Sequence, residues 1–151
     1  MRSKAHIEQE SLKNLQALIE INLDSAAGFK TASDETEVSR HKTLLRDQAI
    51  ERERFAHELQ DELRRLGDVA ETDGSWKASV HRWWMDARNT LSSDERDLYA
   101  EMERGEEAIL KKYQETVKDV QGWPVHAVVQ RQLEAIKAGH DRIQDLRRAA
   151  D

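Results

Sequence analysis

The chain has 151 residues, of which 36% are charged and 1 is proline, and this composition is typical of a single domain built from long helices. Its net charge of −6, with acids and bases interspersed, argues against nucleic acid as a partner, and its 0 cysteines exclude disulfides and thiol chemistry. No apolar run approaches the roughly 20 residues of a membrane span, and residues 1–10 lack the apolar stretch of an export signal, so we expect a cytoplasmic protein without a membrane partner.

The N-terminal part of the chain predicts two long amphipathic helices. Over residues 7–31, apolar side chains recur at steps of three and four, which is the spacing of one helix face. Ser33 and Asp34 then favour a turn and an N-cap for the next helix. The second helix is predicted over residues 37–66, and Gly67 is a natural residue to follow its C-terminal end.

The segment that follows predicts a loop and a shorter helix. Residues 67–75 contain Gly, Asp and Thr, which are common in loops. Ser75 can cap a short helix over about residues 76–90. The whole connection, roughly 27 residues, is longer than two neighbouring antiparallel helices need.

Two further long helices are predicted in the C-terminal part. Ser92 and Glu95 form a capping box, which starts a helix that continues to about Val120. Gly122 and Pro124 interrupt the helical pattern there. Pro124 suits the first position of the last helix, which continues to the end of the chain.

Four helices of about 25 residues, each roughly 37 Å long, favour an all-α four-helix bundle with nearly parallel or antiparallel packing. The long connection predicts a crossover that returns along the bundle, with its own short helix, between the second and third long helices. That is a ferritin-like arrangement. A simple up-down-up-down bundle with an appended helix is the alternative. In either case residues 1–151 are expected to form one domain.

Five segments, in order along the chain, carry a resemblance to a known family: LIEINLDSAAGF (18–29), QAIERERFAHELQ (48–60), HRWWMDARNTL (81–91), MERGEEAILKKYQ (102–114) and QRQLEAIKAGHDRIQDLR (130–147). The chain resembles the uncharacterised bacterial ferritin-like four-helix-bundle family, domain of unknown function 2383, over nearly its whole length. The resemblance implies a fold. The family has no established activity, so the resemblance implies no catalytic residue.

The wider ferritin-like group suggests a test for a di-iron or di-manganese centre. Such a centre takes one Glu from each of two helices and a Glu-x-x-His pair from each of the other two. The spacing matters because residues three apart share a helix face, so carboxylate and imidazole point at the same ion. None of the 6 histidines follows a glutamate at this spacing. The sequence therefore does not predict the usual centre.

Two looser pairs, Glu37 with His41 and Glu53 with His57, have the spacing Glu-x-x-x-His. Glu53 and His57 fall far from the apolar stripe of their helix, so we expect them to face solvent. A solvated charged face is the simpler interpretation of both pairs.

Three other acidic residues also lie away from the centres of the apolar stripes of their helices. Glu20 and Asp24 lie off the stripe of the first helix and are expected to face outward. Glu103 lies at the flank of the third long helix.

Six polar residues do fall within apolar stripes and are predicted to form a core polar network. A buried Arg52 needs a carboxylate, and Glu106 is the acid among the six. A guanidinium placed where a pair of cations would sit both fills the space and repels metal. The network comprises Asn22, Gln48, Arg52, Glu106, Gln132 and His140.

Three interpretations of this network remain open. The first is that it fixes the register of the helices, since buried polar groups can serve specificity. The second is a ligand pocket. The third is a metal site that uses Glu103, Glu106 and His140.

The tryptophans of the connection are candidates for an interaction surface. Trp83 and Trp84 are neighbours, so they cannot share one direction on a helix, and one of them is free to face outward. An exposed Trp beside His81 and Met85 would suit self-association. The alternative is that both, together with Trp76, cap the bundle as core residues.

The sequence supports three functional hypotheses. The first is a non-enzymatic structural or interaction protein without a cofactor, a metal-free ferritin-like bundle that forms a homodimer; no feature identifies another protein partner. The second is a ferritin-like di-iron or di-manganese protein with oxidase, peroxidase or metal-storage activity. The third is a protein that binds a small ligand within the bundle.

Overall fold

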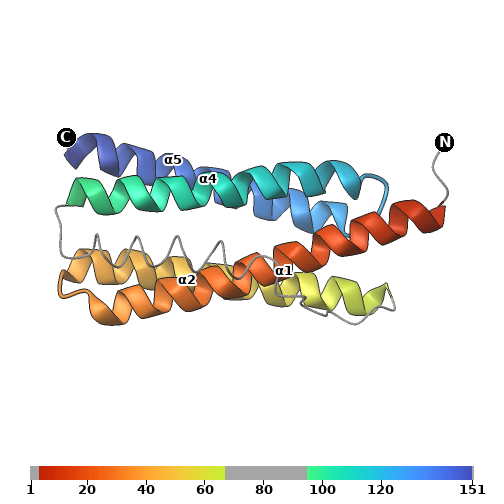
Figure 1. The fold of residues 1–151 in the computed structure, drawn as a ribbon, viewed down its shortest axis with the longest axis horizontal. Helices are drawn as coiled ribbons and strands as arrows, with labels where there is room; N and C mark the ends of the chain where they lie inside the picture. Colours follow the sequence, from red (N-terminus) through yellow and green to blue (C-terminus); the bar gives the residue numbers. More distant parts are fainter. Residues whose placement is uncertain (1–3, 67–94, 151) are drawn as a thin grey trace.

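The computed structural model describes residues 4–66 and 95–150, and these residues form four long helices and no strand. Figure 1 shows them as two helical hairpins lying side by side. The prediction of an all-α four-helix protein is confirmed. The helices are α1 (Lys4–Glu35), α2 (Ser39–Arg65), α4 (Glu95–Asp119) and α5 (His126–Ala150).

The helices α2 and α4 run in the same direction (Figure 1). Near the start of both, the rings of His41 and Tyr99 meet edge to face with their centroids 5.6 Å apart. Further along both, Arg52 pairs with Glu106. The end of α2 and the start of α4 therefore lie at opposite ends of the bundle. An up-down-up-down bundle would make these two helices antiparallel, so that alternative does not describe the chain.

The predicted short helix over residues 76–90 lies outside the described residues, together with its cap Ser75. The same holds for Ser92, whereas its capping-box partner Glu95 is the first residue of α4. None of the described helices is long and apolar enough to cross a membrane.

The connection between α1 and α2 differs from the prediction. Ser33 and Asp34 lie in the last turn of α1 and do not cap α2. The buried Ser33 hydroxyl donates to the carbonyl oxygen of Lys42 at 2.9 Å, so this residue ties the two helices together. The N-cap position of α2 is Val38, whose N–H donates to the Thr36 hydroxyl at 3.3 Å.

The break between α4 and α5 is confirmed, but its details differ. Gly122 has φ of 87°, a conformation that glycine adopts without steric cost. Pro124 precedes α5 and is not its first residue. The reason is that the backbone makes two successive turns, in which the N–H groups of Trp123 and His126 donate to the carbonyls of Val120 and Trp123, each at 3.0 Å.

The apolar core is divided into two clusters along the bundle axis. In α2, Leu45 and Ala49 belong to one cluster and Phe55 to the other, so Arg52 lies between them. In α4, Glu106 likewise falls between the two. The charged pair therefore lies in the middle of the bundle, between the two apolar clusters. The first cluster contains Phe29, Ala32, Leu45, Ala49, Tyr99, Met102 and Ile143; the second includes Leu15, Leu18, Ile19, Phe55, Leu59, Leu63, Ile109, Val129 and Ile136.

Candidate functional site

A buried ion pair joins α2 to α4 in the middle of the bundle. The side chains of Arg52 and Glu106 are both 0% exposed. Nη2 of Arg52 donates to Oε2 of Glu106, and also to Oε1 of Gln48 at 3.3 Å. A Cβ added to Gly139 of α5 would lie 3.8–3.9 Å from Gln48 and Glu106, so α5 closes the side of the pair. The structure thus brings together three of the six predicted network residues.

The ion pair is under opposing electrostatic influences. Burial raises the pKa of Glu106, because a carboxylate loses its hydration in the core. The Arg52 guanidinium acts in the opposite direction, through its charge and its hydrogen bond. Loss of Arg52 would remove that compensation, so protonation of Glu106 depends on its partner.

The pair is also not fully hydrogen-bonded. Within the described residues, Nε and Nη1 of Arg52 and Oε1 of Glu106 are buried without a hydrogen-bond partner. Nη1 of Arg52 lies 3.7 Å from a carboxylate oxygen of Glu51, close enough for attraction between the charges. A buried network in which some groups lack partners is sensitive to any change in its members.

The other two predicted amides belong to a second, separate chain of hydrogen bonds. Nδ2 of Asn22 donates to the Tyr113 hydroxyl at 2.7 Å, and that hydroxyl donates to Oε1 of Gln132 at 2.7 Å. Nε2 of Gln132 then donates to the carbonyl oxygen of Phe55 at 3.2 Å. This chain links α1, α4, α5 and α2. Burial raises the pKa of Tyr113, so its hydroxyl keeps its proton and acts as a donor.

Tyr113 was missed as a network residue, because it fits the apolar stripe of its helix. A tyrosine in a core position nevertheless predicts a polar neighbour, since its buried hydroxyl needs a hydrogen-bond partner. The two amides on the neighbouring helices supply that partner.

We expect Tyr113→Phe to lower the free energy of unfolding by about 1–3 kcal/mol, because it leaves Oε1 of Gln132 buried without its donor. Urea denaturation measures the effect. Thr116→Val is the matched control: Thr116 is also buried on α4, but its hydroxyl donates to the carbonyl of its own helix at Lys112. A loss for Tyr113→Phe no larger than that of the control would contradict the role of the hydroxyl.

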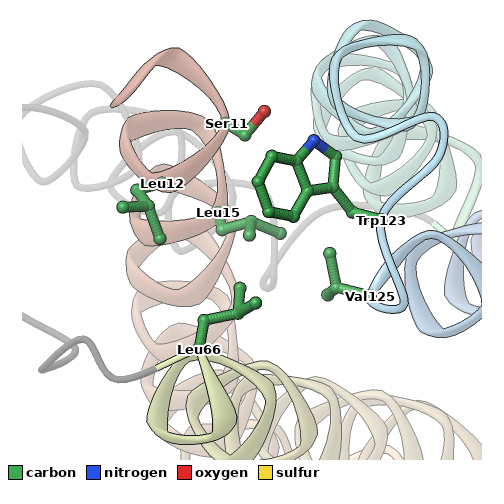
Figure 2. A pocket seen from close by; sticks show the side chains of 6 residues that line it. All are labelled: Ser11, Leu12, Leu15, Leu66, Trp123 and Val125. Carbon is green, nitrogen blue, oxygen red and sulfur yellow. The ribbon is translucent and has the colours of Figure 1, made fainter. Parts of the chain in front are cut away.

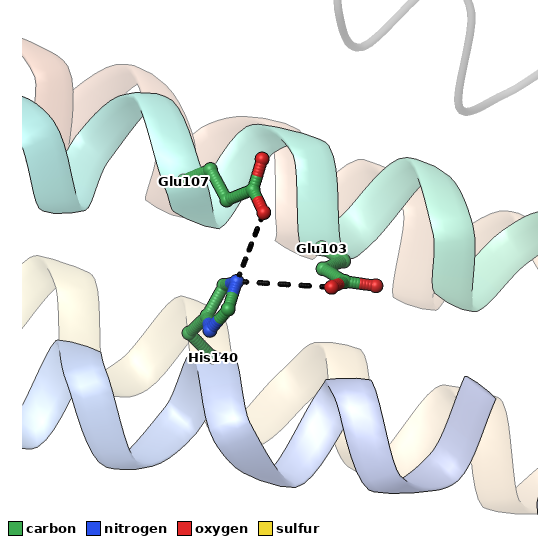
Figure 3. Close-up of side chains that lie close together, drawn as sticks. All are labelled: Glu103, Glu107 and His140. Carbon is green, nitrogen blue, oxygen red and sulfur yellow. Dashed lines mark hydrogen bonds and ion pairs between the residues drawn. The ribbon is translucent and has the colours of Figure 1, made fainter. Parts of the chain in front are cut away.

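His140, the sixth predicted network residue, lies apart from both networks. Nε2 of His140 is 3.3 Å from Oε1 of Glu107 and 3.8 Å from Oε1 of Glu103 (Figure 3). The His140 side chain lies at the outer edge of the α4–α5 interface, where it is 13% exposed. The sequence-based metal set of Glu103, Glu106 and His140 is therefore divided: Glu103 and His140 meet Glu107, while Glu106 faces Arg52.

Glu103 is more buried than a flank position suggests. Its two carboxylate oxygens accept hydrogen bonds from α5: Nη1 of Arg147 donates to Oε2 at 2.7 Å, and Nε2 of Gln144 donates to Oε1 at 3.2 Å. The flank of α4 packs against α5, so Glu103, at the edge of the apolar stripe, is buried in the interface between these two helices.

The expectation for the acidic residues of α1 was wrong for Glu20, which is 5% exposed, and Asp24 is half-buried. Residues 18–22 are all buried in succession, so α1 is covered on more than one side. A single-stripe description therefore underestimates burial on this helix.

The looser Glu-x-x-x-His pairs behave differently from each other. Glu53 and His57 have side chains 65% and 62% exposed, as predicted. Glu37 is exposed, whereas His41 is buried against Tyr99, so an exposed charged face does not describe His41. Glu37 and His41 do not converge on a common point in the core.

The ferritin-like group implies a di-metal centre, and the residues at the middle of this bundle do not fit one. Such a centre needs several carboxylates and two imidazoles that converge between the helices. Here the carboxylate of Glu106 is bonded to a guanidinium, which also donates to the amide oxygen of Gln48 and lies 3.7 Å from a carboxylate oxygen of Glu51.

A separate cavity of about 110 Å³ lies near the end of the bundle where α2 ends (Figure 2). Its described lining is apolar apart from the indole N–H of Trp123 and the hydroxyl of Ser11, which donates to the carbonyl oxygen of Asp119 at 2.9 Å. The described lining therefore offers no charged group to orient a polar ligand. The lining residues are Ser11, Leu12, Leu15, Leu66, Trp123 and Val125.

The predicted interaction surface at Trp83 and Trp84 lies outside the described residues, and so do Trp76, His81 and Met85.

Comparison with curated proteins gave no match. A family model described as a domain of unknown function (DUF2383) matches residues 10–119. This range holds most of α1, all of α2 and all of α4, including Asn22, Gln48, Arg52 and Glu106. The match ends before α5 begins. Because it spans well over half of the chain, the protein belongs to the DUF2383 family.

Proposed function

We propose that this chain is a non-enzymatic, ferritin-like helical-bundle protein of structural or interaction type, cytoplasmic and homodimeric, with a polar core that holds no metal. The observation that carries the proposal is the buried pair of Arg52 and Glu106 between the two apolar clusters. An arginine side chain stays protonated at any physiological pH, so it is a permanent cation in the middle of the bundle. A second cation there would be repelled.

The ferritin-like part of the proposal is supported by topology. Parallel α2 and α4 require a long connection between opposite ends of the bundle, as in ferritin-like folds with one crossover.

The non-enzymatic part is supported by the burial of the polar groups. Arg52, Glu106 and Gln132 are fully buried, and Tyr113 is as well, so a substrate would have to open the helix packing to reach them. Catalytic groups must come within hydrogen-bond reach of the substrate. A layer closed in this way is better suited to fixing the register and partner choice of the helices than to chemistry.

The metal-free core is tested by anaerobic loading with Fe(II) or Mn(II), followed by elemental analysis of the desalted protein. The chain should be loaded both as wild type and as Glu107→Gln, because Glu107 belongs to the outer cluster with His140 and not to the core. We expect the Glu107→Gln chain to retain well under one ion. Retention of about two ions, as a di-metal centre binds, and their loss on Glu106→Ala would show that the core is a metal centre.

The homodimer is tested by sedimentation equilibrium over a range of protein concentrations. We expect a dimer at micromolar concentration. A strict monomer throughout would remove this part of the proposal and leave the description of the core unchanged.

A further inference from the structure

A second cluster of ionisable side chains lies at the outer edge of the α4–α5 interface. Glu103 and Glu107 stand one turn apart on α4, and both point toward His140 of α5 (Figure 3). One ligand atom from each of the three lies within 4.8 Å of the others. The core ion pair takes no part in this arrangement.

The two nitrogens of the His140 ring both face carboxylates. Nε2 is 3.3 Å from Glu107 and 3.8 Å from Glu103, and Nδ1 is 3.4 Å from Oδ1 of Asp141. A neutral imidazole has one N–H and one lone pair. If Nδ1 carries the proton toward Asp141, the lone pair of Nε2 points at two anions, which is unfavourable unless a cation stands between them. Either a second proton or a metal ion can be that cation.

The contact with Asp141 orients the ring and is independent of the two glutamates. Histidines that ligate metals usually donate their other ring N–H to a carboxylate, which fixes the tautomer and turns the lone pair toward the metal. Two residues of α5 hold Glu103 in a comparable way: Arg147 donates to Oε2 at 2.7 Å, and Gln144 donates to Oε1 at 3.2 Å, with Oε1 on the side of His140. Both groups are thereby oriented toward a common point.

We propose that Glu103, Glu107 and His140 bind one divalent transition-metal ion, with Asp141 and Arg147 as positioning residues. A set of two carboxylate oxygens and one imidazole nitrogen suits zinc and its first-row neighbours better than magnesium or calcium, which favour oxygen ligands. Three protein ligands leave room for water in the remaining positions. The Glu107 side chain is 59% exposed, so an ion reaches the site without opening the bundle. This site goes beyond the proposed function and does not depend on it.

The direct test is titration of the full chain at pH 7.5 with Co²⁺, followed by its visible d–d absorption, and with Zn²⁺, followed by calorimetry. We expect one ion per chain. Glu107→Gln should weaken binding at least about tenfold, the scale of effect at ligand-supporting positions, and His140→Ala should abolish it. Because Glu107 is exposed, the glutamine variant is expected to fold as the wild type does, which circular dichroism checks.

The matched control is His57→Ala. His57 also has a glutamate carboxylate near its ring, with Glu53 at 3.7 Å, but this pair is exposed and, within residues 4–66 and 95–150, belongs to no cluster of three such ligands. We expect this variant to bind as tightly as wild type. Absence of saturable binding, or equal affinity in wild type, Glu107→Gln and His140→Ala, would overturn the proposal. Metal loading of Glu106→Ala separates this failure from failure of the metal-free core, because ions held in the core would be lost in that variant.

Discussion

Replacing Arg52 with leucine is expected to lower the free energy of unfolding by about 3–5 kcal/mol, the usual cost of breaking a buried ion pair from one side. The leucine removes the hydrogen-bond donor of both Glu106 and Gln48. Glu106 is then left as a buried acid without its counter-charge, and Gln48 loses a partner. Packing alone does not offset these losses, because leucine cannot hydrogen-bond to either group.

Thermal melting measures this effect. For a domain of this size each kcal/mol shifts the melting temperature by about 2–4 °C, so we expect a drop of about 6–20 °C. Arg46→Leu is the control, because Arg46 lies on the same helix but is exposed. A melting temperature for Arg52→Leu within about 2 °C of wild type would show that Arg52 is not a buried, paired cation.

The cost of Arg52→Leu should also depend on pH. Burial raises the pKa of Glu106 in the folded state, and without Arg52 that rise is no longer opposed. An acid whose folded pKa exceeds its unfolded pKa loses stability as the pH rises from the unfolded value through the folded one. The destabilisation relative to wild type should therefore be smaller at pH 5 than at pH 8. An equal difference at both pH values would indicate that Glu106 is not the group left unpaired.

The second large effect is expected for Glu106→Leu. This variant leaves Arg52 buried without a carboxylate, and a guanidinium cannot lose its proton to escape the cost. We therefore expect a loss of about 3–5 kcal/mol or more, at least as large as for Arg52→Leu.

The double variant Arg52→Leu with Glu106→Leu completes the test. When both partners become apolar, no charge is left unpaired, and such replacements are often neutral or stabilising. We expect the double variant to be more stable than either single variant, as measured by urea denaturation of all four proteins. Costs that simply add would show that the two side chains do not interact.

Much of the fold followed from the spacing of apolar residues. Stripes at steps of three and four located all four described helices to within a few residues of their ends, because each helix buries at least one continuous face. The length of the connection favoured a crossover, and the parallel course of α2 and α4 agrees with it. The caps were less well predicted: Ser33 has the chemistry of a cap, but it bonds to the backbone of the next helix instead.

The polar core could be predicted because a charged residue inside an apolar stripe has few explanations. This reasoning pairs Arg52 with Glu106, and the two side chains are bonded in the structure. The stripe method did not place His140, since it gives the direction of a side chain to within a sector of the helix and cannot tell the centre of the bundle from the edge of an interface. It missed Tyr113 because an aromatic ring fits the apolar stripe.

The outer cluster could not be predicted, because it depends on how α4 and α5 lie against each other. Glu103 and Glu107 are one turn apart and share a face, which the sequence does show. His140 lies opposite both glutamates because of the register between α4 and α5. The spacing of residues within one helix does not determine that register.

The central claim is that a guanidinium, and not a pair of metal ions, occupies the middle of the bundle. Crystals of the protein loaded anaerobically with Fe(II), measured on both sides of the iron absorption edge, test it most directly. We expect the Arg52 side chain to be hydrogen-bonded to Glu106 between the two apolar clusters, with no anomalous peak beside it. Two anomalous peaks bridged by inward-facing carboxylates, or an Arg52 side chain that extends into solvent, would contradict the account.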